Sequence, residues 1–428
     1  MRGLNVDRYR GADAATQYIQ QVLDVQGGDG RTIALLYIGL DQFKRINQSF
    51  GHNIGDQLLY SIGRRLHRLV TLHAHAVRIG GDTFVYLFAY QTVDDIHEVI
   101  EQLHAQLRLP FRMGEQDIYI GASIGVSRFP EHADNAEQLV KAAEMAMADI
   151  KEQIGSRVQM YDEKLNEKLE RRFQIHAELA RAVQQWPFTL YYQPIIELED
   201  KRPVGMECLI RWFHPVLGAI PPSEFIPLAE ETGLIAPIGM WVLEEACAQN
   251  KQWQDAGLPP IVMSVNLSSR QFYDPSFLGA LIGILRRTGL APQWLELEIT
   301  EGVMMDIHAA LPILRELGAL GIQLAIDDFG TGYSSLKYLK ELPVNKLKID
   351  RSFIQHIETD AVHAAIVQAL LAMSAQLGLH VVTEGVERPE ELEVLQQLGC
   401  KFAQGYLFSR PVPAEAAFEL LQGVPISP

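Results

Sequence analysis

Residues 323–350 read QLAIDDFGTGYSSLKYLKELPVNKLKID. An apolar run, Gln323–Phe329, ends in two adjacent aspartates, and a glycine-containing segment and a helical pattern follow it. A second apolar run, Lys346–Ile349, closes the stretch. Strands that alternate with helical segments are typical of βα units joined into a parallel sheet.

The same cycle of apolar run, polar strand end and helical segment recurs throughout the second half of the chain. The eight runs are Leu190–Ile196, Val204–Trp212, Ile261–Leu267, Leu295–Thr300, Gln323–Phe329, Lys346–Ile349, His380–Val386 and Lys401–Phe408. This repetition predicts a C-terminal (β/α)8-type, TIM-like barrel.

Polar side chains lie within these runs or at their ends. They are Glu207, Asn266, Glu298, Asp327, Asp328, Asp350, Glu384 and Gln404. A carboxylate in an apolar strand is costly unless it is paired or bound to a metal. Because the C-terminal strand ends of such barrels form the active site, we expect these side chains to share one rim.

Two explanations account for the carboxylates. Each one could form a salt bridge with a barrel arginine or lysine, and this explanation suffices for any single residue. Six acidic groups on one predicted rim, with only Arg211 and Lys348 as nearby strand cations, instead favour divalent metal. Ligand sets rich in oxygen suit Mg²⁺ or Mn²⁺ rather than zinc.

The first half of the chain also shows strand-like runs. They are Thr32–Ile38, Val77–Ile79, Phe84–Ala89 and Ile118–Val126. Helical patterns at Asp56–Val70 and Asp94–Leu107 separate them, which predicts an α/β domain over residues 1–161. Residues 162–185 contain no glycine or proline. Their apolar residues recur at four-residue spacing, so we interpret Asp162–Gln185 as a connecting helix.

Composition limits the classes of partner and environment. The formal net charge of −16 argues against binding a nucleic acid polymer or anionic lipid. Cys208, Cys247 and Cys400 form no CxxC pair, so we expect a reducing, cytoplasmic location. Residues 361–383 carry no charge, yet their polar side chains favour a buried helix and a strand over membrane insertion. Residues 1–24 show no signal peptide, and whether a sensor or membrane segment precedes residue 1 in a longer protein stays open.

Several motifs in the second half occur in the order of the EAL phosphodiesterase family. They are Glu207-Cys208-Leu209, Asn266-Leu267-Ser268, Glu298-Ile299-Thr300-Glu301, Asp327-Asp328-Phe329-Gly330-Thr331-Gly332, Lys348-Ile349-Asp350, Glu384-Gly385-Val386-Glu387 and Gln404-Gly405. Residues 173–428 therefore resemble that family, which implies hydrolysis of cyclic-di-GMP to linear pGpG. The middle alanine of the name motif is Cys208 here, a change that keeps the carboxylate of Glu207.

The resemblance implies a site with two metal ions. The implied ligands are Glu207, Asn266, Glu298 and Asp327 for one ion and Asp327, Asp328 and Glu384 for the other. Ions that share a carboxylate lie close enough to act on one water and hold a phosphate oxygen. Lys348 would stabilise the forming hydroxide and the phosphoryl charge, with Asp350 beside it on the same strand face.

The resemblance also assigns a loop and the substrate contacts. Glu301 resembles the residue that anchors the loop Asp328–Ser335, whose glycines allow it to move as metal ions bind. Gln193, Arg211 and Gln404 resemble substrate contacts. For Arg211, a structural ion pair within the barrel is an equally good explanation.

The first half carries the motifs of a second family. Val77–Val85 predicts a β-hairpin around Gly80-Gly81. Its companions are Phe43-Lys44-Arg45-Ile46-Asn47, Gly51-His52-Asn53-Ile54-Gly55-Asp56 and Ser123-Ile124-Gly125-Val126. This half therefore resembles the GGDEF diguanylate cyclase family and implies a nucleotidyl-cyclase-like α/β sandwich.

Two positions depart from that family. Gly39 stands where the family has a metal-binding Asp, and Thr83 replaces the signature Glu. Asp82 is then the only clear carboxylate left of the metal set, too few to neutralise a triphosphate and activate a 3′-hydroxyl. We therefore expect a degenerate GGDEF domain without cyclase activity.

Asn47 and Asp56 match guanine-contacting positions of the cyclase family. GTP binding without turnover therefore stays open, beside a structural role as a capping Asn and a helix-starting Asp. Bound GTP would act as an allosteric ligand, transmitted through Asp162–Gln185.

The motifs together predict a metal-dependent cyclic-di-GMP phosphodiesterase, and the resemblance to the family implies a homodimer. The main alternative is a cyclic-di-GMP receptor that binds without cutting. Receptor versions of the fold commonly lack metal ligands or the loop motif, and neither is missing here. A bifunctional synthase and hydrolase is a third alternative, which the losses at Gly39 and Thr83 oppose.

Overall fold

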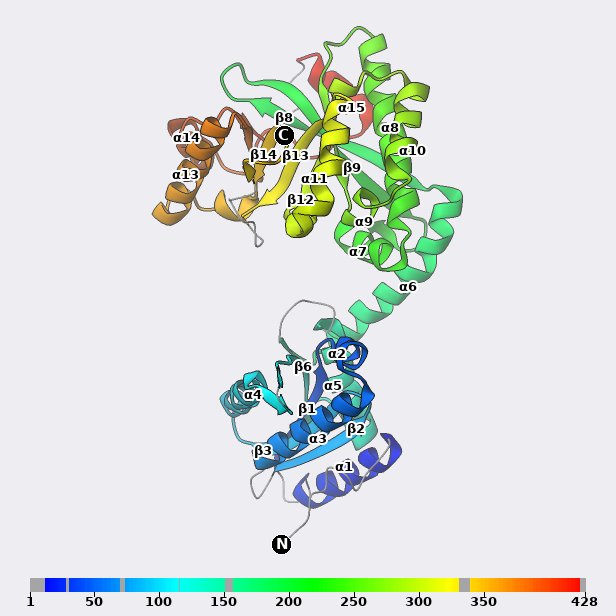
Figure 1. Ribbon diagram of the computed structural model, residues 1–428, viewed down its shortest axis with the longest axis vertical. Helices are drawn as coiled ribbons and strands as arrows, with labels where there is room; N and C mark the ends of the chain where they lie inside the picture. Colours follow the sequence, from blue (N-terminus) through cyan, green and yellow to red (C-terminus); the bar gives the residue numbers. More distant parts are fainter. Residues whose placement is uncertain are drawn as a thin grey trace. The chain divides into compact units, whose positions relative to one another are not determined.

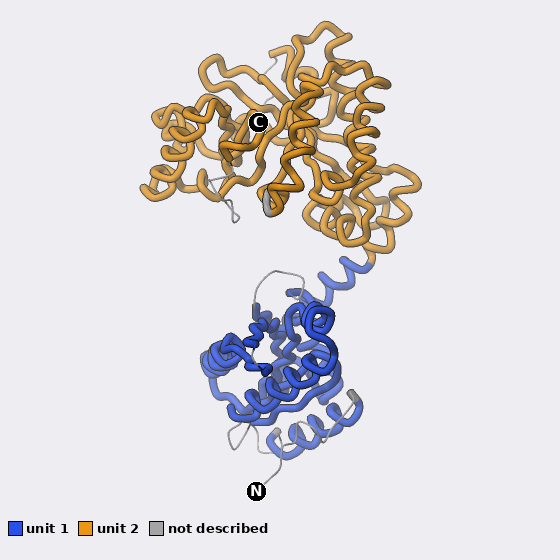
Figure 2. The backbone as a smooth tube through the Cα atoms, in the orientation of Figure 1, with its two compact units in different colours: residues 1–173 blue, residues 174–428 orange. Residues whose placement is uncertain are grey.

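The computed structural model of the chain describes residues 12–27, 31–69, 74–114, 116–150, 157–330 and 339–423. The chain divides into two units, residues 1–173 and 174–428, and each is described by itself (Figure 2). Val70, at the end of a predicted helix, and most of the predicted loop Asp328–Ser335 lie outside the described residues.

A five-stranded sheet in the order β2-β3-β1-β6-β7 forms the centre of the first unit (Figure 1). Its strands are β1 (Thr32–Leu40), β2 (Ala74–Gly80), β3 (Thr83–Tyr90), β6 (Ala122–Phe129) and β7 (Val158–Met160). Central β1 pairs antiparallel with both β3 and β6. This cyclase-like α/β fold is the one expected from the sequence.

Alternating side chains of β1 supply two separate cores, one on each face of the sheet. Leu36 and Ile38 pack in a cluster with Leu58 and Ile62 of α3, and Ile33 and Leu35 pack with Ile19 of α1. Successive strand residues point to opposite faces, so a fully apolar strand needs helices on both sides. The helices are α1 (Ala12–Gly27), α2 (Phe43–Phe50), α3 (His52–Arg68), α4 (Val93–Arg108) and α5 (Ala136–Ile150).

The predicted strand Ile118–Val126 is divided in the structure. Its first residue ends β5 (Gln116–Ile118), which forms a small hairpin with β4 (Phe111–Met113). Its remainder belongs to β6 in the main sheet. Between them the carbonyl of Gly121 accepts a hydrogen bond from the backbone N–H of Asp41. The apolar residues continue without a break from one sheet to the other, so the sequence pattern did not reveal that two strands are present.

Eight strands close into a barrel in the second unit. In ring order they are β8 (Phe188–Glu197), β9 (Arg202–His214), β11 (Val262–Leu267), β12 (Leu295–Thr300), β13 (Gln323–Phe329), β14 (Lys346–Ile349), β15 (His380–Thr383) and β16 (Phe402–Ala403). β16 pairs with β8 to close the ring, and β10 (Gly218–Ile220) pairs with β9 as a short addition. The predicted TIM-like barrel is confirmed.

The first strand of the barrel runs against the others. β8 is antiparallel to both β9 and β16, whereas β9 and β11–β16 pair in parallel along the ring. Only the short turn 198–201 joins β8 to β9. A short turn can connect antiparallel strands only, since a parallel connection needs a crossover of a dozen or more residues.

Helices surround the barrel and connect its strands. Among the described residues they are α7 (Pro222–Thr232), α8 (Ile235–Asp255), α9 (Ser269–Phe272), α10 (Phe277–Thr288), α11 (Ile307–Ala319), α13 (Ala361–Leu377), α14 (Pro389–Gln397) and α15 (Ala414–Leu421). The helix α6 (Glu163–Gln185) spans the boundary between the two units in sequence, and its residues Ile175 and Leu179 belong to the core of the second unit. The 3₁₀ turns in the described part of this unit are η2 (Pro292–Trp294), η3 (Glu301–Asp306) and η4 (Arg351–Phe353). Within the described parts of the chain, no helix has the length and hydrophobicity needed to cross a membrane.

The uncharged stretch 361–383 forms α13 followed by β15, as predicted. The helix is less buried than expected, because Val367 and Ser374 are its only fully buried residues. Its exposed positions are mostly alanine and glutamine, while its larger leucine, isoleucine and methionine side chains are half-buried, which explains how an uncharged helix can lie at the surface.

Candidate active site

The polar side chains of the barrel converge at the C-terminal ends of its strands. Glu207 lies in β9, Asn266 in β11, Glu298 in β12 and Asp327 in β13. Lys348 lies in β14, and Glu384 and Gln404 directly follow β15 and β16. Glu298 and Lys348 are each 1% exposed, whereas Asn266 and Asp328 are exposed. The cluster is therefore deep at one end and open to solvent at the other.

Lys348 lies at the centre of four carboxylates. Its Nζ is 2.6 Å from Glu384 Oε1 and 2.8 Å from Glu298 Oε1. The distances to Asp327 Oδ1 and Glu207 Oε2 are 3.0 and 3.5 Å. Burial lowers the pKa of the Lys348 ammonium, but these carboxylates outweigh that effect and raise its pKa well above the usual value. Lys348 is therefore a permanent cation in this environment.

One lysine does not neutralise the cluster. Burial raises the pKa of Glu384 to about 8, an effect that Lys348 opposes and the charge of Asp327 increases. Loss of solvation and the charges of Asp327 and Asp350 raise the pKa of Asp328 to about 6. Burial also raises the pKa of Glu298 well above its usual value, although Lys348 opposes this. Carboxylates that resist ionisation beside a lysine mark a site with excess negative charge, which suits added cations.

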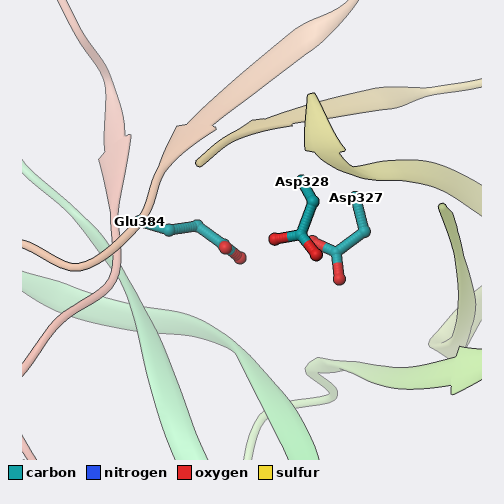
Figure 3. A group of neighbouring side chains, drawn as sticks. All are labelled: Asp327, Asp328 and Glu384. Carbon is teal, nitrogen blue, oxygen red and sulfur yellow. The ribbon is translucent and has the colours of Figure 1, made fainter. Parts of the chain in front are cut away.

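Asp327, Asp328 and Glu384 form the tightest acidic group. One carboxylate oxygen from each lies within 4.8 Å of the others, and Figure 3 shows the three side chains facing a common space. Neighbouring strand residues normally point to opposite faces. Asp328 instead has φ 51°, and the register of β13 with β14 is irregular between Ile326 and Phe329. This left-handed backbone conformation, which Asp adopts more readily than most residues, brings both aspartate side chains to one side of the strand.

Amide side chains fix the orientation of Glu207. Asn266 Nδ2 donates to Glu207 Oε1 at 2.9 Å, and Gln404 Nε2 donates to Glu207 Oε2 at 2.6 Å. Gln404 Nε2 also donates to Gln193 Oε1 at 3.0 Å, while Gln193 Nε2 donates to the carbonyl of Ser409. Gln193 and Gln404, predicted as substrate contacts, thus form a buried chain behind Glu207.

The donor chemistry fits divalent metal. The implied ligands offer only oxygen atoms, the preference of Mg²⁺ and Mn²⁺. Glu298 Oε2 is buried and has no hydrogen-bond partner among the described residues, a costly arrangement that a cation would relieve. The carboxylates of Asp327, Asp328 and Glu384 are already close enough together to form one of the two implied ligand sets. The other implied set surrounds Lys348.

The remaining predicted residues lie around this cluster. Glu301 opens η3, and its Oε1 accepts a 2.5 Å hydrogen bond from the N–H of Gly330. Asp350 lies just beyond β14, which ends at Ile349, and it caps η4 by accepting a hydrogen bond from the N–H of Ser352. Asp350 is therefore not on the same strand as Lys348, contrary to the expectation from the sequence. Arg211 lies 5.5 Å from the ring centre of Tyr191 and donates to the carbonyl of Ile210. In the described residues no carboxylate lies within ion-pair distance of Arg211.

Sequence reasoning missed a second charged layer inside the barrel. Lys346 is a strand cation as well, so the expectation that Arg211 and Lys348 are the only cations on nearby strands was wrong. The Nζ atom of Lys346 lies 2.7 Å from Glu296 Oε1. Ser264 Oγ donates to the same oxygen. The signal was available, because Glu296 and Lys346 are charged residues within predicted apolar strands.

In the first unit, the two positions that the sequence led us to expect as departures from the cyclase family face each other. Gly39 of β1 is the register partner of Thr83 of β3. Asn47, in α2, directs its Oδ1 against Gly55, and this oxygen is buried without a partner among the described residues. Asp56 lies exposed in α3. The predicted guanine contacts are therefore close in sequence and fold; Asp56 is exposed, whereas Asn47 is half-buried.

Comparisons with known families match both halves. The EAL domain model matches residues 176–411, and the model described as diguanylate cyclase, GGDEF domain matches residues 13–157.

Two curated relatives come from Pseudomonas aeruginosa. MucR, a bifunctional diguanylate cyclase/cyclic di-GMP phosphodiesterase, is 39% identical over 94% of this chain and 58% of its own length. NbdA, a cyclic di-GMP phosphodiesterase, is 37% identical over 92% of this chain and 50% of its own length. The chain thus spans only 50% to 58% of the lengths of these two relatives.

Solved structures of EAL domains are similar to the second unit. The PaMucR phosphodiesterase in its c-di-GMP complex is 46% identical, with a TM-score of 0.55 over 57% of this chain and 99% of that chain. The FimX EAL domain from Pseudomonas aeruginosa bound to c-di-GMP is 29% identical, with a TM-score of 0.51 over 56% of this chain and 96% of that chain. By its matched domains and relatives, the chain belongs to the EAL domain family and carries a GGDEF domain in front of its EAL domain.

Proposed function

We propose that the chain is a metal-dependent phosphodiesterase that hydrolyses cyclic-di-GMP to linear pGpG. The observation that carries the proposal is the convergence of Glu207, Glu298, Asp327, Asp328 and Glu384 around Lys348 at the open end of an EAL barrel. The names of MucR and NbdA, and the bound c-di-GMP of the PaMucR structure, support the choice of substrate.

In the proposed reaction a water oxygen loses a proton and bonds to phosphorus, and the bond from phosphorus to a ribose 3′-oxygen breaks. That oxygen keeps the electron pair of the bond and takes up a proton to become the 3′-hydroxyl of pGpG. Two Mg²⁺ or Mn²⁺ ions, held by Glu207, Asn266, Glu298 and Asp327 and by Asp327, Asp328 and Glu384, would supply acidity to the water and charge stabilisation to the phosphate. Lys348, a buried and permanent cation, donates to the phosphoryl oxygens as negative charge develops. Asp350 adds negative charge beside Asp328.

The protein groups around the site orient these side chains and the substrate. Asn266 and Gln404 hold Glu207 in one orientation, and Gln193 holds Gln404. Arg211 is half-buried at the rim with its guanidinium against Tyr191. Because it has no carboxylate partner among the described residues, we assign it a contact with a guanine or phosphate of cyclic-di-GMP. Glu301 anchors the start of the loop after β13 through Gly330.

The GGDEF domain is proposed to regulate rather than to synthesise. Gly39 and Thr83 face each other where the cyclase family places metal ligands, which supports a degenerate domain without cyclase activity. GTP is its proposed allosteric ligand, with Asn47 and Asp56 as contacts. We also propose a homodimer, which light scattering of the purified chain checks directly.

The proposed activity is tested by incubating the purified chain with cyclic-di-GMP and Mg²⁺ or Mn²⁺, with and without GTP, and separating the products by chromatography. Glu207→Gln is the test variant. Glu244→Gln is its matched control, because Glu244 pairs with Arg287 on the surface. The proposal expects pGpG from the native chain and the control but not from Glu207→Gln. Binding of cyclic-di-GMP without product in either metal would identify a receptor instead.

A further inference from the structure

A second polar cluster lies inside the barrel beneath the candidate active site. It consists of Ser264 in β11, Glu296 in β12 and Lys346 in β14. Each lies two residues before a member of the site, namely Asn266, Glu298 and Lys348. Side chains two positions apart on a strand point to the same face, so both sets project into the barrel.

Short hydrogen bonds hold this lower cluster together. Lys346 Nζ lies 2.7 Å from Glu296 Oε1, and Ser264 Oγ lies 2.6 Å from the same oxygen. Glu296 is fully buried, and the side chain of Lys346 is 13% exposed. Between their strands runs β13, where Ala325 pairs in register with both Glu298 and Lys346. The small side chain of Ala325 leaves space for Lys346 to cross to β12.

Stability alone does not account for this cluster. The interior of a TIM-type barrel is usually filled by branched apolar residues. Replacing a buried ion pair by apolar residues of similar volume is often neutral or stabilising, because burial removes both charges from water. The cluster does join the three strands that carry Asn266, Glu298 and Lys348, directly below those side chains.

Resting on the proposed function, we propose that Ser264, Glu296 and Lys346 are positioning residues that hold β11, β12 and β14 at the spacing metal binding requires. The 2.8 Å contact of Lys348 Nζ with Glu298 Oε1 spans β12 and β14, the same two strands that Lys346 and Glu296 connect one step lower. Partners that orient metal ligands typically contribute about 10- to 100-fold to metal affinity. Because Ser264, Glu296 and Lys346 lie directly below Asn266, Glu298 and Lys348, we expect them to affect metal affinity to a similar degree.

The test measures Mn²⁺ binding directly, by the electron paramagnetic resonance signal of free Mn²⁺, together with the melting temperature of each metal-free protein. The variants are Glu296→Gln and the double variant Glu296→Gln/Lys346→Met. Asn250→Ala is the matched control. Asn250 is fully buried and donates to the carbonyls of Ile261 and Trp294, just before β11 and β12, so it supports the same strands away from the site.

The expected result separates positioning from stability. Glu296→Gln leaves the largely buried ammonium of Lys346 without a charged partner, so the melting temperature of the variant falls and its Mn²⁺ affinity falls about 10- to 100-fold. The double variant recovers the melting temperature but keeps the weakened affinity. Asn250→Ala loses melting temperature and binds Mn²⁺ as the native chain does.

Native Mn²⁺ affinity in a folded double variant overturns the positioning role, as does an equal loss of affinity in Asn250→Ala. The double variant keeps the test decisive even when Glu296→Gln fails to fold. Failure of the proposed function looks different, because the native chain itself would then bind no Mn²⁺ or release no pGpG.

Discussion

The ammonium of Lys348 lies 2.6 Å from Glu384 Oε1, inside a ring of carboxylates that it only partly neutralises. In this position a lysine can stabilise negative charge on the phosphoryl group without being a metal ligand. Lys348→Met is therefore expected to lower kcat about 100- to 1,000-fold, the usual effect of removing one group that stabilises transition-state charge.

The same variant should bind Mn²⁺ at least as tightly as the native chain, because a positive charge has left the site. Calorimetric titration checks the affinity. Lys251→Met, which removes a surface lysine paired with Asp255, is the control. A Lys348→Met protein that no longer binds Mn²⁺ contradicts the separation of roles.

Metal affinity should rise with pH. In the metal-free protein Asp328 has a pKa of about 6 and Glu384 a pKa of about 8, so both hold protons at low pH. A carboxylate must lose its proton to bind a metal ion. Affinity therefore increases from pH 6 to pH 8 and levels off above, and binding at pH 6.5 releases protons. Titrations in two buffers with different ionisation enthalpies measure the release, and an affinity independent of pH speaks against these pKa values.

The raised pKa values also predict how the metal-free protein responds to pH. A carboxyl group with a higher pKa when folded binds its proton more tightly in the folded state, so folding is favoured below that pKa. The metal-free melting temperature should fall as pH rises toward 8, and saturating Mg²⁺ should remove most of the decline. Thermal melts at pH 6 and 8 with and without Mg²⁺ check this, and a metal-free protein that becomes more stable over this range disagrees with it.

The GGDEF domain should release no cyclic-di-GMP from GTP and Mg²⁺. Because Gly39 and Thr83 are register partners, Gly39→Asp and Thr83→Glu together place two carboxylates opposite each other beside Asp82. The double variant should bind Mn²⁺ in the presence of GTP at a site the native domain lacks. Glu207→Gln is included in both proteins, so that any cyclic-di-GMP formed is preserved for chromatography. Synthesis by the otherwise native chain contradicts the degenerate assignment.

Gly55→Ala tests whether the α2–α3 junction can accept a side chain. A Cβ at this position would lie 1.9 Å from Asn47 Oδ1, so the amide must move. The first unit should lose about 1–3 kcal/mol of stability, the usual range for overpacking. Hydrolysis measured without GTP should be unchanged. Amide hydrogen exchange in α2 and α3 measures this loss of stability. Unaltered protection of these amides would show that the Asn47 side chain moves aside without destabilising the unit.

The strands and carboxylates of the barrel were predictable because charge within an apolar strand is a strong local signal. The reversed direction of β8 was missed, although the seven residues between the predicted runs Leu190–Ile196 and Val204–Trp212 are too few for a parallel crossover. The convergence of Asp327 and Asp328 depends on the left-handed φ of Asp328, which a period-two pattern does not anticipate.

Roles that depend on contacts between distant strands were hardest to predict. Gln193 matches a substrate-contact motif, and that role stays a prediction; its hydrogen bonds with Gln404 and with the carbonyl of Ser409, 216 residues away in sequence, were not anticipated. Lys346 was overlooked although it opens a predicted strand, because its partner Glu296 is 50 residues away. Only the closed barrel brings these groups together.

The central claim is that the acidic cluster around Lys348 cuts cyclic-di-GMP. Chromatography of cyclic-di-GMP incubated with the native chain and Mn²⁺, beside Glu207→Gln and Glu244→Gln, tests it most directly. We predict conversion to pGpG by the native chain and by Glu244→Gln, with none by Glu207→Gln. Intact cyclic-di-GMP in the presence of native protein that binds both the nucleotide and Mn²⁺ would contradict the claim.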